Sequence, residues 1–225
     1  MNEVTIVTAF FDIGREKFPG FERGTAHYLE YFRFWARIKN RVIVYTSSDY
    51  AEAILETRRN FGLADKTEVI VSDDLSTFDK ETLEGIKKVM ARPEYLAFRK
   101  YRKNPECNYP LYNYLTYLKP FFVMDAIKRG LAAGSVAWLD FGYNHGGKYY
   151  THSADFDYLW QFDCKDKMHL FAVRKLDNKP IQAIIRANKS YISGGLILGP
   201  VQRWQALRDS FQEAMRRLLD LNLTD

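Results

Sequence analysis

Cysteine is scarce in this chain, and long apolar runs are missing. Only Cys107 and Cys164 occur among 225 residues, far apart and in unlike surroundings. This excludes a disulfide framework and a cysteine-based zinc site, and it predicts a reduced, cytoplasmic protein. No segment approaches the roughly 18 apolar residues of a membrane span. The first residues carry acid at Glu3 and Asp12 rather than a basic leader, so we expect no signal peptide.

Motifs of several common enzyme classes are also missing. There is no Gly-x-Ser-x-Gly nucleophile elbow and no Walker phosphate-binding loop. The segment GREKFPG lacks the glycine spacing of a dinucleotide-binding loop, which argues against a Rossmann dehydrogenase. No repeat, low-complexity run or linker divides the chain. We therefore expect a single domain over residues 1–225.

The chain is basic, with a net charge of +5. This favours an anionic partner such as a nucleotide, a phosphorylated glycan or an acidic membrane surface, and an ordinary basic surface explains the charge equally well. Residues 98–103, FRKYRK, combine basic and aromatic side chains that suit acceptor phosphates or an anionic membrane. No nucleic-acid motif accompanies them, so we expect no nucleic-acid partner.

The hydrophobic pattern predicts an α/β fold. Apolar runs at 4–11, 42–46 and 68–71 have the length of buried strands, and helical patterns at 24–38 and 49–61 separate them. This alternation is typical of a parallel sheet covered by helices. Residues 79–130 form a helical insertion before the next strand, which ends at Asp140. Strand-like segments follow within 169–175 and 191–199, and residues 202–221 form an amphipathic helix.

Polar side chains follow three of the predicted strands. Thr8, Asp12, Gly14 and Arg15 lie at the end of the first, Asp73 and Asp74 follow the third, and Asp140, Asn144 and His145 follow the fourth. Because ligands bind at the carboxyl ends of parallel strands, these groups should share one rim. Such a rim suits a nucleotide diphosphate with Mg²⁺ or Mn²⁺, which is commonly held by one or two carboxylates and the phosphates. The alternative for each aspartate is capping of a turn or helix.

Four segments, VTAFFDIGR, YLKPFFV, VAWLDFGY and SGGLILG, resemble the HtrL/YibB family, which is associated with bacterial lipopolysaccharide and capsule gene clusters. The order of elements resembles GT-A type glycosyltransferases. The resemblance implies a GT-A-like, mostly parallel sheet and a sugar transfer from a nucleotide-diphosphate donor to a bacterial surface glycan or glycolipid, with peripheral contact at the inner membrane. It also implies a donor site at the residues Thr8, Ala9, Phe10, Arg15, Asp73, Lys119, Asp140, Gly142, Ser193, Gly194 and Gly195. The Mn²⁺ or Mg²⁺ ligands would be Asp140, Asn144 and His145.

Two features depart from that pattern. Gly142 stands where an Asp-x-Asp motif has its second carboxylate, and the sequence ends at LNLTD, where relatives continue. The alternatives are a non-catalytic binding protein on a degraded transferase scaffold, or a sugar-nucleotide hydrolase or nucleotidyltransferase. Retention and inversion of the sugar's configuration both remain open. An inverting enzyme needs a base over the acceptor, and the candidates are Asp163, Asp166, Asp225 and His145.

Overall fold

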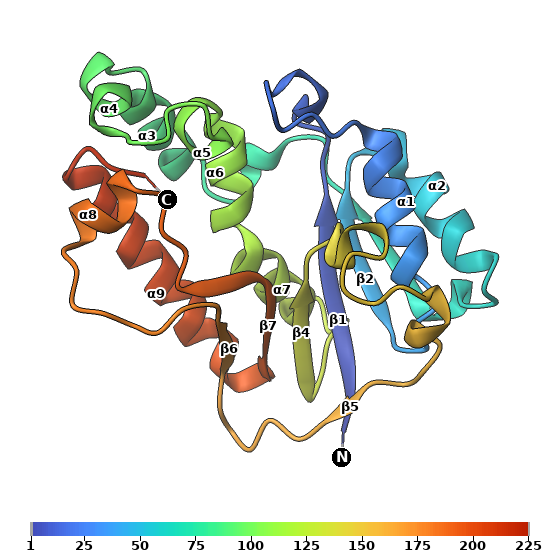
Figure 1. Cartoon of the computed structure of the whole chain (residues 1–225). Coiled ribbons are helices and arrows are strands. Elements are labelled where there is room, and N and C mark those ends of the chain that lie inside the picture. The colour runs from blue at the N-terminus through green and yellow to red at the C-terminus, as the bar shows by residue number, and fades with distance from the viewer. Residues whose placement is uncertain (1, 225) are drawn as a thin grey trace.

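A mixed, mostly parallel sheet forms the centre of the protein, as the sequence predicts. The computed structural model describes residues 2–224. Along the sheet the strands run in the order β3-β2-β1-β4-β7-β6, and β5 pairs with the beginning of β1 (Figure 1). Pairing is parallel from β3 to β4 and antiparallel at β7, β6 and β5. The strands are β1 (Asn2–Phe10), β2 (Val42–Thr46), β3 (Thr67–Val71), β4 (Ser135–Leu139), β5 (Gln161–Phe162), β6 (His169–Ala172) and β7 (Ile192–Pro200).

Side chains of the central strands alternate between two apolar cores. Val7, Val136 and Trp138 point into one core, whereas Ile6 and Ala137 point into the other. Both faces of β1, β2 and β4 are therefore covered, which explains why these strands read as continuous apolar runs rather than as an alternating pattern.

Helices cover both faces of the sheet (Figure 1). α1 (Thr25–Trp35) and α2 (Ser48–Arg59) contribute Phe32, Trp35 and Ile54 to the core on one face. α3 (Lys80–Met90), α6 (Pro110–Tyr117), α7 (Lys119–Lys128) and α9 (Val201–Asp220) build the core on the other face. Among the described helices, none is long and apolar enough to cross a bilayer.

The predicted helical insertion, residues 79–130, is confirmed as a run of helices. It holds α3, α4 (Pro93–Phe98), α5 (Pro105–Asn108), α6 and α7, and a proline stands in the first turn of each helix after α3. Proline suits the first helical turn, where its missing N–H leaves no bond unmade, and it stops the preceding segment from continuing as a helix. The insertion is more than an elaboration, because α7 packs directly on β1 and β4.

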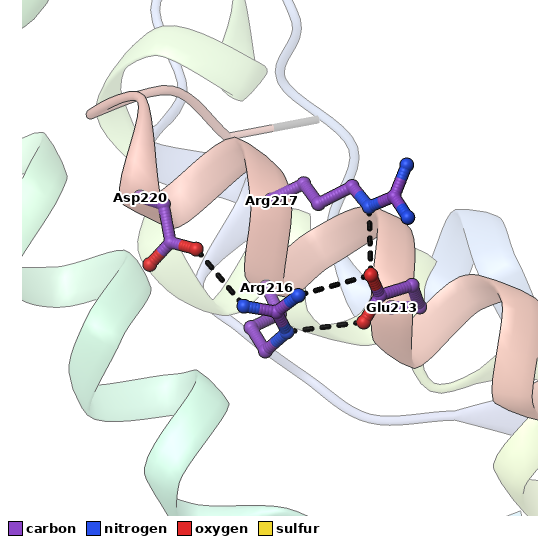
Figure 2. Close-up of polar contacts among 4 residues, drawn as sticks. All are labelled: Glu213, Arg216, Arg217 and Asp220. Atoms are coloured by element: carbon purple, nitrogen blue, oxygen red, sulfur yellow. Dashed lines mark hydrogen bonds and ion pairs between the residues drawn. The ribbon is translucent and has the colours of Figure 1, made fainter.

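The C-terminal helix α9 is amphipathic, as its sequence predicts. Trp204 and Met215 are buried, whereas the opposite face carries charged pairs. Arg216 bonds to Glu213 and Asp220, and Arg217 shares the Glu213 carboxylate (Figure 2). Pairs at this spacing support a solvated helix by a few tenths of a kcal/mol each. We therefore assign this face a structural role.

Candidate functional site

Asp140 lies at the carboxyl edge of the parallel strands, where the sequence places it. It directly follows β4, and its backbone is held on both sides: its N–H donates to the Gly195 carbonyl at 2.9 Å, and its own carbonyl accepts from the Tyr143 N–H at 2.8 Å. The first bond ties Asp140 to β7. The position of this carboxylate is therefore fixed by two strands and not by a free loop.

The Asp140 carboxylate is held by Lys119 and Trp138. Its Oδ1 accepts from Lys119 Nζ at 2.8 Å and from Trp138 Nε1 at 2.7 Å. Lys119 Nζ also donates to the Gly194 carbonyl at 2.8 Å. The Lys119 side chain is only 12% exposed, and that of Asp140 is 40% exposed. We call Lys119, Trp138, Asp140 and Gly194 the Lys119–Asp140 cluster.

Two glycines allow β7 to lie against this cluster. A Cβ at Gly194 would come within 3.3 Å of Lys119 Nζ, and one at Gly195 would lie 3.6 Å from Asp140 Oδ2. Glycine at these positions thus lets the β7 backbone approach the charged pair, and it leaves room beside Asp140 Oδ2. The double glycine of the SGG segment therefore has a packing role, whether or not it also contacts a ligand.

A first cavity of about 540 Å³ opens above the carboxyl ends of β1 and β4. Its size is typical of a small-molecule site. Its basic members are Arg15, Arg23 and Lys119, and its acidic members are Asp12, Glu106 and Asp140. The ends of β1 and β4, the loop after β1, and helices α1 and α6 all contribute to its wall.

Arg15 lies in this cavity within an aromatic cage. Its guanidinium carbon is 5.8 Å from the ring centroids of Phe18 and Tyr28 and 5.2 Å from that of Tyr112. Nη1 donates to the Tyr28 hydroxyl at 2.5 Å, whereas the buried Nε has no hydrogen-bond partner in residues 2–224. Burial raises the pKa of Tyr28 and, for Tyr112, raises the pKa to about 12. Both phenols are therefore protonated donors at neutral pH.

A second cavity of about 520 Å³ also borders the cluster. Its apolar wall comes from α6, α8 (Ile181–Arg186) and α9, and its polar groups include Asn188, Lys189 and Ser190. The residues that line both cavities are Glu106, Tyr112, Thr116, Lys119, Asp140 and Gly195. Two pockets of similar size therefore meet at one lysine–aspartate pair. The apolar residues of the second cavity are Tyr117, Ile184, Ile185, Phe211, Ala214, Met215 and Leu218.

The structure brings most of the predicted donor-site residues together. Those that line the first cavity are Ala9, Phe10, Arg15, Lys119, Asp140, Gly142, Ser193 and Gly195, and Gly194 lines the second. Thr8 and Asp73 line neither cavity. Thr8 is fully buried inside β1, and its Oγ1 has no hydrogen-bond partner in the described part of the chain. Asp73 accepts from the Ser48 N–H at 2.7 Å, so it satisfies the first backbone N–H of α2.

Gly142 packs against aromatic side chains at the wall of the first cavity. A Cβ there would lie 3.2 Å from the Tyr28 ring and 3.5 Å from the Tyr31 ring. The glycine therefore makes space for the aromatic side chains of α1. Gly142 also lines the first cavity, so its place in the donor site stays a prediction.

Asn144 and His145 do not join Asp140 in a metal ligand set. Asn144 is 2% exposed, and its Oδ1 accepts from the backbone N–H groups of Tyr149 and Tyr150 at 2.9 and 2.8 Å. Its amide is thus committed to holding the loop. His145 stacks on Tyr31 with ring centroids 5.7 Å apart, and burial lowers its pKa.

The side chains present do not fit Mn²⁺ or Mg²⁺. Across residues 2–224, no group of three or more histidine, cysteine, aspartate or glutamate side chains could hold a metal ion. Asp140 Oδ1 already faces the Lys119 ammonium and the Trp138 N–H, and Gly142 supplies no second carboxylate. A hard divalent cation prefers several oxygen ligands, and within residues 2–224 Asp140 belongs to no such group of side chains.

Among the described residues, most of the bases predicted for the acceptor lie outside both cavities. Asp166 is paired with Arg203, and Asp163 accepts from the Lys165 N–H. Neither aspartate lines the first or the second cavity. Asp225 lies outside the described residues. His145 lines the first cavity only. Glu106, which the sequence analysis did not select, lines both; its one sequence signal is an acid between two prolines, at Pro105 and Pro110.

Comparison with known proteins assigns the family. The family model described as "Bacterial protein of unknown function (HtrL_YibB)" matches residues 2–225. Protein HtrL of Escherichia coli (strain K12) is 33% identical over 239 aligned residues, which cover 100% of this chain and 81% of that protein. The crystal structure of mouse xyloside xylosyltransferase 1 in its apo form aligns with 97% of this chain and 75% of its own, with 11% identity and a TM-score of 0.42. That alignment is loose and carries nothing about activity. The chain belongs to the HtrL/YibB family of bacterial proteins.

Proposed function

We propose that this protein is a glycosyltransferase that moves a sugar from a nucleotide-diphosphate donor to a glycan acceptor. The observation that carries the proposal is the meeting of two cavities at Lys119 and Asp140. A group transfer needs two substrates that enter separately and touch at one reacting centre, because proximity and orientation provide much of the rate enhancement. A single-substrate hydrolase needs one cavity and a path for water.

The first cavity suits the donor. It lies at the carboxyl ends of β1 and β4, where α/β sheets bind nucleotides. Arg15 offers a buried Nε without a hydrogen-bond partner in residues 2–224, and a phosphate oxygen would satisfy it. Ala9 and Phe10, at the end of β1, would face the nucleoside. The protonated hydroxyls of Tyr28 and Tyr112 supply further donors to the diphosphate.

The second cavity suits the acceptor. Its aliphatic and aromatic wall offers packing for the apolar face of a sugar ring, and Asn188, Lys189 and Ser190 offer polar contacts to hydroxyls. Glu106 lines both cavities and would take the proton of the attacking hydroxyl in a single direct displacement, which inverts the configuration at the sugar C1.

The family resemblance, and not the pocket, supports the acceptor class that we propose. It is a bacterial surface glycan, in the lipopolysaccharide core or capsule, or a glycolipid precursor at the inner membrane face. Lys100 and Lys103 in the basic segment 98–103 are exposed and suit an anionic surface, whereas Arg99 is 1% exposed and bonded within the protein.

Thermal-shift and calorimetric titrations with UDP, GDP, CDP and ADP test the donor site. We expect one of the four to bind and raise the melting temperature, since a ligand that binds only the folded state stabilises it. Absence of any shift would favour the degraded-scaffold alternative. Turnover of the matching nucleotide sugars is then followed by mass spectrometry with and without lipopolysaccharide core oligosaccharides. Release of free sugar at an equal rate without acceptor would instead indicate a hydrolase.

Glu106→Gln separates nucleotide binding from sugar transfer. This variant keeps the shape of the side chain and removes the base, so nucleoside diphosphate affinity should stay within about twofold while transfer falls by about 100-fold or more. Asp163→Asn, outside both cavities, is the matched control and should transfer at the parent rate. Equal transfer by Glu106→Gln and the parent would remove Glu106 from the reaction.

A further inference from the structure

We propose that the Lys119 ammonium occupies the place of a divalent cation in this site and stabilises the leaving diphosphate. The proposal rests on the proposed function, because it concerns the charge that develops on the donor. Asp140 is then a positioning residue that holds Lys119, and it is not a metal ligand.

The first reason is the position of the ammonium. Lys119 Nζ lies 2.8 Å from Asp140 Oδ1, so a positive charge already pairs with this carboxylate oxygen. Trp138 Nε1 donates to the same oxygen at 2.7 Å. A Mg²⁺ ion needs ligand oxygens at about 2.1 Å in a near-octahedral shell, so an ion bound at Oδ1 would have to displace Lys119 and break the bond from Trp138. Gly142 and the committed Asn144 give it nothing in exchange.

The second reason is the remaining hydrogen-bonding capacity of Lys119. An ammonium group has three N–H donors. Asp140 Oδ1 and the Gly194 carbonyl take two of them, each at 2.8 Å, and no third acceptor for Nζ lies in the part of the chain that the structure describes. Lys119 lines both cavities, so this third donor is available to a ligand held between them.

The third reason is rigidity in a shielded setting. Lys119 stands at the first position of α7, is 12% exposed, and lies 5.8 Å from the centroid of the Trp138 ring. A cation fixed in advance and partly removed from water stabilises developing charge more strongly than a solvated one, because it does not need to reorganise. Arg15 supplies a second positive charge in the same cavity, so the cluster does not have to neutralise the diphosphate alone.

The reaction step is balanced without a metal. The bond between the sugar C1 and the β-phosphate oxygen breaks, and its electron pair stays on that oxygen. The acceptor hydroxyl oxygen forms the new bond to C1, and its proton passes to Glu106. Lys119 keeps all its protons and donates a hydrogen bond to the phosphate oxygen, whose negative charge grows as the bond breaks.

Calorimetric titration of the parent protein with UDP, GDP, CDP and ADP, in excess EDTA and again in excess Mn²⁺, tests the proposal. We expect the nucleotide that binds to show the same dissociation constant within about twofold in both buffers. Lys119→Ala should weaken its binding by about 10- to 100-fold in both buffers, as expected for loss of a hydrogen bond to a charged group. Lys119→Arg, which keeps the charge, should recover part of the loss.

The matched control is Lys128→Ala, an exposed lysine on the same helix, whose nucleotide affinity should equal that of the parent. Binding that disappears in EDTA and returns with Mn²⁺ would overturn the inference while leaving the proposed function standing. Absence of binding by all four nucleotides in both buffers would overturn the proposed function itself. The comparison of buffers uses the parent protein, so it holds even where a Lys119 variant folds poorly.

Discussion

Replacing Asp140 with asparagine separates a positioning role from a metal-binding role. Asparagine keeps an oxygen that accepts from Trp138 and Lys119, and it removes one negative charge. Exposed ion pairs contribute roughly 0.2–1 kcal/mol. Asp140 is 40% exposed and Lys119 only 12%, so we place this pair at the upper end, at about 1 kcal/mol. For a chain of this size the melting temperature should fall by about 2–4 °C.

The expected change in nucleoside diphosphate affinity of Asp140→Asn has opposite signs for a positioning role and for a metal-binding role of Asp140. When Lys119 loses its anionic partner, about 1 kcal/mol of competing attraction disappears, so nucleoside diphosphate affinity in EDTA should stay equal or rise by up to about fivefold. Sugar transfer should fall, because a neutral amide holds the Lys119 ammonium less firmly than the carboxylate does. If Asp140 instead binds a metal, Asp140→Asn loses nucleotide affinity in Mn²⁺. Calorimetry in both buffers decides, and a loss of affinity confined to Mn²⁺ would refute the reasoning.

Three further substitutions test the fold around the site. Arg58→Met should lower the free energy of unfolding by about 4 kcal/mol in a urea titration. The fully buried guanidinium donates to three backbone carbonyls between α1 and β2, and these carbonyls would lose their partners. A loss below about 1 kcal/mol would contradict this. Thr8→Val should be neutral or stabilising by about 1 kcal/mol, since it removes a buried hydroxyl without a hydrogen-bond partner in residues 2–224, and nucleotide affinity should not change. A weakened affinity would return Thr8 to the donor site. Hydrogen bonds from Arg216 and Arg217 lower the pKa of Glu213 from 4.5 to about 2. The ionised carboxylate therefore stabilises the fold at pH values above its unfolded-state pKa, and this contribution is lost as the pH falls from about 4.5 to 2. Glu213→Gln should flatten the acid limb of a stability-against-pH curve, and an unchanged limb would remove this pair from the account.

The strands and the place of Asp140 were predictable because their causes are local. Residues 42–46 form β2 as expected, since a run of five β-branched and aromatic residues is too short for a typical helix and favours a buried strand. Asp140 follows from the end of such a run. The role of Asp73 was open in the sequence, where capping and ligand binding have the same pattern, and the structure shows it bonded to the first backbone N–H of α2.

The partners of Asp140 were not predictable, because they depend on distant packing. Lys119 precedes it by 21 positions and reaches it only because α7 lies on β1 and β4. Asn144 has the composition of a metal ligand, yet its amide satisfies backbone groups five and six residues later, a local competition that no motif reveals. The second cavity joins α6, α8, β7 and α9, which no sequence period connects.

The central claim is that the first cavity binds the diphosphate of a sugar donor beside the Lys119–Asp140 cluster. A crystal structure with the nucleoside diphosphate that binds most tightly tests it directly. The account predicts the β-phosphate within hydrogen-bonding distance of Lys119 Nζ, with Arg15 Nε on a phosphate oxygen and Asp140 still paired with Lys119. Phosphates bound elsewhere on the protein, or a metal ion seated between Asp140 and the diphosphate with Lys119 turned away, would contradict it.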